Sequence, residues 1–134
     1  MRVLTALLFS DGRPGSYHLA EGIVTAINHI RPVVTVRLEV SRGWWSGKIL
    51  ALLINAGASP HWVLKKVYGL DPDALPPADL IVSSGAETLP ANIAAARILD
   101  VPNIYYGSLR WYRTTDFTLV LTSYARDAAA ANPA

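Results

Sequence analysis

Residues 3–15 read VLTALLFSDGRPG, and this stretch decides the fold class. Residues 3–9 form a nearly uninterrupted apolar run, which is typical of a strand buried on both faces of a parallel sheet. Ser10, Asp11 and Gly12 end that run and open a turn. Apolar side chains then recur at helical spacing at Leu19, Ile23, Ala26, Ile27 and Ile30. The sequence therefore predicts a strand, a turn and a helix that ends before Pro32.

The alternation of strands and helices continues along the chain. Residues 33–40 are rich in β-branched side chains and predict a second strand, and residues 79–84, 101–106 and 117–122 predict three more. Two helices are expected between residues 43 and 69, with Ser46 and Ser59 as N-caps, before a stiff connection over residues 71–77. A further helix is expected over residues 91–99, with polar positions at Asn92, Arg97 and Asp100. This order indicates an α/β, three-layer Rossmann-like domain with a mostly parallel five-stranded sheet.

Length and composition allow one folded domain. With 134 residues, 51% of them hydrophobic and 16% charged, the chain has room for a single Rossmann-like domain spanning residues 1–134, with residues 125–134 as a flexible tail. The sequence has no cysteine, which excludes disulfides, thiol nucleophiles and thiolate metal sites. Its three histidines are far apart without ligand-like spacing, so we expect no metal site.

Charge and targeting features favour a cytoplasmic protein that does not bind nucleic acid. The net charge is +2, but the basic residues are spread among ten acidic ones instead of clustering on one element. The chain begins directly with strand-like sequence and lacks the features of a secretion signal. The segment that contains Trp44, Trp45 and Trp62 with Lys65 and Lys66 is compatible with core helices, or alternatively with peripheral contact to a membrane surface.

The first candidate binding loop follows the first strand. In parallel sheets, ligands collect at the carboxyl ends of strands, where loops lead into helix N-termini. Two glycines in this loop permit close approach of a ligand to the backbone, and an arginine supplies a fork-shaped cation for phosphate or carboxylate. The alternative is that the glycines only shape a tight turn. The candidate ligand-binding residues are Gly12, Arg13, Pro14, Gly15 and Ser16.

Two further loops offer polar groups at the same sheet edge. After the third strand, hydroxyls and amides are candidates to hold a sugar or phosphate at Ser84, Gly85, Glu87 and Thr88. Glu87 has the alternative role of favouring the helix dipole. After the fourth strand, Ser108 lies among aromatic residues that stack on a base or sugar, or else cover the sheet edge. Asp11 and His18 are the candidate general bases.

Three common cofactor motifs are missing. Gly12 and Gly15 are followed by His18 where a dinucleotide fingerprint needs a third glycine. No tyrosine is followed four residues later by lysine, and Gly47-Lys48 lacks the remainder of a P-loop. We therefore predict no cofactor, and expect neither a dehydrogenase, an epimerase nor an ATPase.

The hexapeptide SDGRPG at residues 10–15 carries a family resemblance, together with a Trp- and Leu-rich segment at 44–64, DLIVSSG at 79–85 and the strand at 117–122. The chain resembles the N-terminal half of the mitochondrial-fission (ELongate Mitochondria) family, whose bacterial members are sometimes labelled predicted nucleoside-diphosphate-sugar epimerases. That family is similar to GT-B glycosyltransferases, in which two Rossmann-like halves face a cleft.

This resemblance implies a GT-B-like N-terminal domain. Such a domain would bind an anionic sugar, nucleotide-sugar or lipid-phosphate ligand at the carboxyl edge of its sheet, and without a C-terminal half it would not be catalytic alone. The alternative function is a non-catalytic protein-interaction module. Both functions imply a partner, either the missing half or a second copy in a homodimer.

Overall fold

A computed structural model of the chain describes residues 3–43, 45–109 and 111–121. All five strands lie in one parallel sheet with the order β2-β1-β3-β4-β5, which confirms the α/β, Rossmann-like class. The predicted tail at residues 125–134 and Trp44 lie outside the described residues. The strands are β1 (Leu4–Ser10), β2 (Val33–Glu39), β3 (Leu80–Ser84), β4 (Asn103–Tyr106) and β5 (Leu119–Leu121).

Strand β1 lies inside the sheet, between β2 and β3, as its apolar sequence predicts. Residues 6–10 are all buried, and Phe9 is in register with Leu38 of β2 on one side and with Ser83 of β3 on the other. A strand covered by helices on both faces and by strands on both edges needs apolar side chains in both directions. The predicted burial of this strand on both faces is therefore confirmed.

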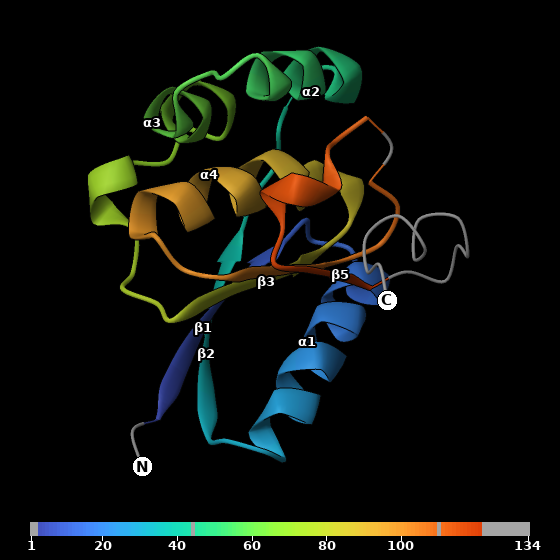
Figure 1. The fold of residues 1–134 in the computed structure, drawn as a ribbon, viewed down its shortest axis with the longest axis vertical. Helices are drawn as coiled ribbons and strands as arrows, with labels where there is room; N and C mark the ends of the chain where they lie inside the picture. Colours follow the sequence, from blue (N-terminus) through green and yellow to red (C-terminus); the bar gives the residue numbers. More distant parts are fainter. Residues whose placement is uncertain (1–2, 44, 110, 122–134) are drawn as a thin grey trace.

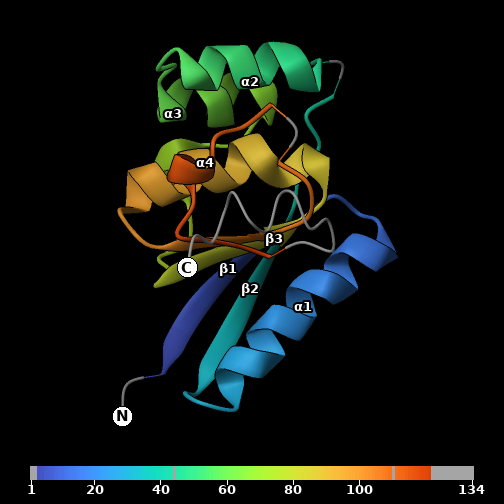
Figure 2. The ribbon, with the colours of Figure 1, turned by 45° about the vertical axis from the view of Figure 1, so that its right-hand side comes forward.

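Helices cover the two faces of the sheet unequally (Figures 1 and 2). Helix α1 (Pro14–Asn28) lies on one face, whereas α4 (Leu89–Leu99) lies on the other. Helix α2 (Gly47–Asn55) and the short α3 (Pro60–Trp62), which continues into the π-helical turn η1 (Val63–Val67), pack against α4 and form the outermost layer on that side. The core between these elements includes the fully buried side chains of Leu50, Leu64 and Ile93.

The two predicted helix N-caps, Ser46 and Ser59, are confirmed. The Ser46 hydroxyl accepts a hydrogen bond from the Ile49 amide at 3.5 Å, and the Ser59 hydroxyl accepts one from the Trp62 amide at 3.4 Å. Short 3₁₀ turns interrupt the predicted connections at Pro72–Ala74 (η2), Ala86–Thr88 (η3) and Thr114–Asp116 (η4). Because η3 follows β3, helix α4 begins only at Leu89 and the Gly85 loop does not lead straight into it.

A buried polar network joins α4 to β4. Asn92, one of the predicted polar positions of the helix, is fully buried. Its amide group donates to Ser83 Oγ at 2.8 Å and to the Ile104 carbonyl at 3.1 Å. Asn103 Nδ2 donates to Asn92 Oδ1 at 2.8 Å and to the Asp116 carbonyl at 2.9 Å. These bonds satisfy the buried amides and fix the position of α4 over the sheet.

An apolar groove of about 470 Å³ lies beside α1, over β4 and β5. Its walls include Leu19 and Ile23 of α1 and Ile104, Leu119 and Leu121 of the two strands. Leu19 and Leu119 are 44% and 37% exposed. In the part of the chain that the structure describes, no helix covers β5 on this face (Figure 2).

Candidate functional site

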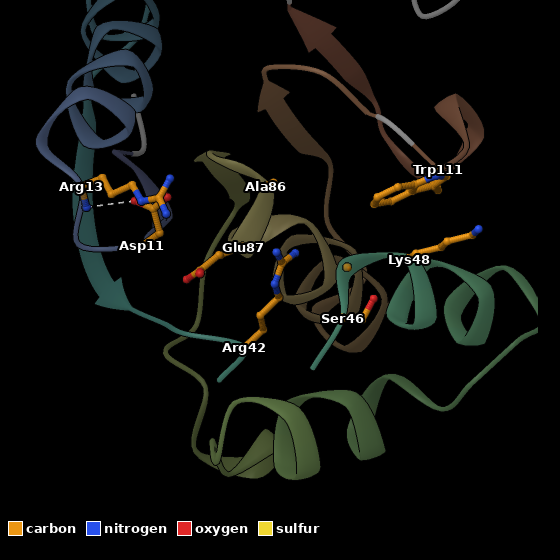
Figure 3. A pocket seen from close by; sticks show the side chains of 9 residues that line it. Asp11, Arg13, Arg42, Ser46, Lys48, Ala86, Glu87 and Trp111 are labelled. Atoms are coloured by element: carbon orange, nitrogen blue, oxygen red, sulfur yellow. Dashed lines mark hydrogen bonds between the residues drawn. The ribbon is translucent and has the colours of Figure 1, made fainter. Parts of the chain in front are cut away.

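A pocket of about 250 Å³ opens at the carboxyl edge of the sheet, and we call it the edge pocket (Figure 3). Its residues follow the ends of β1 and β3, or come from the segment between β2 and α2, the first turn of α2 and the loop after β4. Strand β2 lies on one side of β1, whereas β3, β4 and β5 follow on its other side. The strand order therefore switches between β1 and β3, and ligands of parallel α/β sheets usually bind at such a switch point. The lining residues are Asp11, Arg13, Arg42, Ser46, Gly47, Lys48, Ala86, Glu87 and Trp111.

Three cations line the edge pocket from three separate segments. Arg13 follows β1, Arg42 follows β2, and Lys48 lies in the first turn of α2. None of these three side chains forms a hydrogen bond or an ion pair with another described residue. With only Asp11 and Glu87 as carboxylates in the lining, the pocket has an excess of positive charge that suits an anion.

Arg42 reaches the start of α2 because residue 47 has no side chain. A Cβ atom at Gly47 would lie 2.7 Å from Arg42 Nη1 and 3.5 Å from Trp111 Cζ3. Figure 3 shows the Arg42 guanidinium between Glu87 on one side and Ser46 with Lys48 on the other. Burial raises the pKa of the nearby Tyr112 phenol, and the Arg42 cation acts against that rise. The guanidinium is therefore placed by close packing, without a carboxylate partner among the described residues.

The N-terminus of α2 adds backbone donors to the same region. Ser46 is its N-cap, and Gly47 and Lys48 follow as the first helical residues. Amides in a first helical turn have no partner within the helix, and the helix dipole gives this end a partial positive charge. Together with Arg42 and Lys48, these amides form a region that favours a phosphate or carboxylate group.

Carboxylates and an indole complete the edge pocket. Asp11 Oδ1 accepts a hydrogen bond from the Arg13 amide at 3.0 Å, and the Glu87 side chain points away from Arg42, toward the side of the pocket on which Asp11 and Arg13 lie (Figure 3). Trp111 is 49% exposed, and Asn55 Nδ2 donates to its carbonyl at 3.1 Å, which ties its loop to α2. Carboxylates accept hydrogen bonds from hydroxyl groups, and an indole face packs against a sugar ring or a base.

The structure divides the residues predicted for the first loop. Asp11 and Arg13 line the edge pocket, whereas Pro14 and Gly15 begin α1 outside its lining. The Gly12 amide donates to Ser10 Oγ at 3.2 Å, and the Arg13 amide is bonded to Asp11. The Gly12 and Arg13 amides, which were expected to approach a ligand, therefore donate to side chains of the loop itself. Ser16 follows in α1, and its side chain lies outside what the structure describes.

Two of the four residues predicted to offer hydroxyls, Ser84 and Thr88, have partners within the fold. Ser84 Oγ donates to the Tyr106 carbonyl at 2.8 Å, and the fully buried Thr88 hydroxyl donates to the Gly85 carbonyl at 2.8 Å. Ser108, predicted from the loop after the fourth strand, is half-buried and does not line the edge pocket. Glu87, predicted from the loop after the third strand, does line it.

His18 does not join Asp11 in the edge pocket. The imidazole of His18 is exposed on α1 and lies 3.3 Å from the Glu21 carboxylate. Of the two candidate bases, only Asp11 lines the pocket. The structure therefore separates the two groups that sequence reasoning left as equals.

Sequence reasoning missed Arg42, Ser46 and Lys48 as site residues. It counted the two cations as scattered charges and Ser46 as a helix cap only. The available signal was the position of Arg42 shortly after a predicted strand, because every strand of a parallel sheet ends at the same edge. Applying that rule to the second strand as well as the first would have placed Arg42 beside Arg13.

A search for metal-binding clusters and membrane-spanning helices, and comparisons with known proteins, do not assign a function to the site. Across residues 3–43, 45–109 and 111–121, no three His, Asp or Glu side chains are grouped to hold a metal ion. In the same residues, no helix has the length and apolarity needed to cross a membrane. No family model, curated protein or solved structure matches the chain.

Proposed function

We propose that this chain binds a phosphorylated sugar compound in the edge pocket. The observation that carries the proposal is the convergence of Arg13, Arg42 and Lys48, all without ion-pair partners among the described residues, on one small pocket. Three cations around one space repel one another, so their convergence favours an anionic ligand between them.

The lining suggests how the ligand is oriented. Arg42 and Lys48, with the first amides of α2, are suited to a phosphate group. Asp11 and Glu87 are suited to ligand hydroxyls, and Trp111 to the flat face of a sugar or base. A sugar phosphate, a nucleotide-sugar and a lipid-linked phosphate share this chemistry.

The resemblance of residues 10–15 to GT-B-like sequences supports a more specific proposal. The chain would be one half of a two-domain cleft, and it would hold its ligand without completing a transfer reaction alone. In such a cleft Asp11 is the candidate base for an acceptor hydroxyl, since its carboxylate lines the pocket and is held by the Arg13 amide.

An NMR titration tests the proposed binding. Pyrophosphate, UDP-N-acetylglucosamine and a short-chain lipid phosphate are added separately to labelled protein, with neutral N-acetylglucosamine as the control. We expect saturable shifts of the Gly47, Lys48 and Ala86 amides with the three anionic probes and much weaker shifts with the neutral sugar. The ranking of the three anions separates the ligand classes. Unchanged spectra at millimolar pyrophosphate, or shifts spread evenly over the surface, would contradict the proposal.

A second candidate function is an interaction module, and the apolar groove beside α1 favours it. Leu19 and Leu119 are exposed there, and a partner surface would remove them from water. We infer a second copy of this chain as the simplest occupant.

Light scattering should then show a dimer that Leu119→Asp dissociates. Ile30→Asp, a substitution of an exposed residue just beyond the other end of α1, should leave the dimer intact. A wild-type monomer at high concentration would exclude the homodimer.

A further inference from the structure

The charges of the chain are segregated along its sequence. Between Glu39 and Asp71 there is no acidic residue, although this segment contains four of the 12 basic residues and all three lysines. The remaining chain has ten acidic and eight basic residues. A segment with cations alone produces a local positive potential that the modest net charge of +2 conceals.

The fold places this acid-free segment in the outermost layer of the molecule, formed by α2, α3 and η1 (Figures 1 and 2). The buried side chains of these elements, such as Leu50 and Leu64, belong to the core shared with α4, so the exposed ones face away from it. We call the exposed lysines and large apolar side chains of this layer the outer face, and it consists of Lys48, Ile49, Leu52, Trp62, Lys65 and Lys66.

The outer face combines large apolar side chains with cations. Ile49, Leu52 and Trp62 are 52%, 62% and 36% exposed. Lys65 and Lys66 adjoin Trp62 on the next helical turn, and neither forms an ion pair with another described residue. Exposed aliphatic and indole groups bordered by lysines are the composition of helices that lie in the plane of a membrane surface.

We propose that the outer face docks the protein onto a membrane surface that contains anionic lipid. In this arrangement Ile49, Leu52 and Trp62 enter the boundary between headgroups and acyl chains, while the lysines contact lipid phosphates. The face favours a membrane over a nucleic acid because Ile49 and Leu52 are aliphatic and offer no ring on which a base stacks.

A second pocket beside the outer face supports this assignment. It has a volume of about 570 Å³ and lies between the Trp62, Lys65 and Lys66 side chains and the η2 turn. Asp71 and Asp73 line its other side, and Asp71 Oδ1 accepts a hydrogen bond from the Asp73 amide at 3.0 Å. The pocket gives a lipid headgroup room between two lysines on one wall and two carboxylates on the other.

Vesicle flotation of the full chain tests the proposal. Vesicles of phosphatidylcholine alone are compared with vesicles that also contain phosphatidylglycerol, at low and at high salt. We expect binding only to the anionic vesicles and weaker binding at high salt. Lys66→Glu changes the charge by two units and should reduce the partition coefficient about twenty-fivefold, because each unit charge near an anionic surface contributes about fivefold. Leu52→Ser should reduce it about tenfold through lost apolar contact.

Two matched variants control for charge and hydrophobicity. Arg37→Glu makes the same charge change on β2, and Ile30→Ser removes an 87% exposed aliphatic group at the end of α1. Both should retain vesicle binding within about threefold. The proposal is overturned if neither vesicle binds the wild type, if the control variants lose as much binding as the outer-face variants, or if duplex DNA displaces the protein from anionic vesicles through the same lysines.

Discussion

Replacing Asn103 by leucine is expected to lower the free energy of unfolding by about 3 kcal/mol. Leucine has nearly the same shape, but it leaves Asn92 Oδ1 and the Asp116 carbonyl without the amide donor that Asn103 provides, whereas the Thr118 amide keeps its bond to the backbone carbonyl of residue 103. Each of these groups lies in a largely buried network, and an unsatisfied buried polar group costs about 1–3 kcal/mol. Urea unfolding followed by circular dichroism measures the change.

Two further variants separate the network from a general effect of asparagine. Asn28→Leu removes one exposed hydrogen bond, to the Val33 amide, and should cost about 1 kcal/mol or less. The double variant Asn92→Leu with Asn103→Leu should be less destabilised than the sum of the single variants, because the bond between the two amides is counted in both. Strict additivity would show that the two side chains do not act as one network.

Replacing Arg42 by alanine is expected to weaken pyrophosphate binding ten- to a hundredfold, as measured by isothermal titration calorimetry. A hydrogen bond to a charged group contributes about 1.5–3 kcal/mol, and about 1.4 kcal/mol corresponds to a tenfold change in affinity. The stability should change by about 1 kcal/mol or less, because Arg42 has no ion pair with a described residue that the substitution would break. Binding loss would then not be a consequence of unfolding.

Comparison with two other variants makes this result specific to the guanidinium. Lys66→Ala removes the same charge from the outer face, outside the edge pocket, and should change pyrophosphate affinity by less than about threefold. Arg42→Lys retains the charge without the planar fork and should recover only part of the affinity. Equal pyrophosphate affinity in Arg42→Ala and the wild type would remove the main support for the proposed function.

Local patterns predicted the fold well because the decisive signals lie close together in the sequence. The apolar run of β1 and the serine caps at Ser46 and Ser59 each depend on a few neighbouring residues, and the structure confirms them. Asn92 shows the limit of such reasoning. Whether an asparagine on a helix faces solvent or the sheet depends on which distant strand supplies its partners, and that strand is β4.

The candidate site was only partly predictable for a related reason. Asp11, Arg13 and Glu87 follow strands whose ends were recognised as ligand-binding positions, and they line the edge pocket. Arg42 joins them only because β2 lies beside β1 and because Gly47 leaves space for its guanidinium. Its position after a predicted strand could have marked Arg42 as a candidate, but no pattern in one loop shows that its guanidinium has space to reach the pocket.

The place of β1 between β2 and β3 also has a consequence for the order in which the protein folds. Residues 4–39 contain β1, α1 and β2, and this unit can form as soon as it leaves the ribosome. The other edge of β1 pairs with β3, and the contact between the Thr5 amide and Asp79 spans 74 positions. Until β3 is synthesised, an apolar strand edge stays open to incorrect pairing. Slow folding and early chaperone contact are therefore expected from the topology.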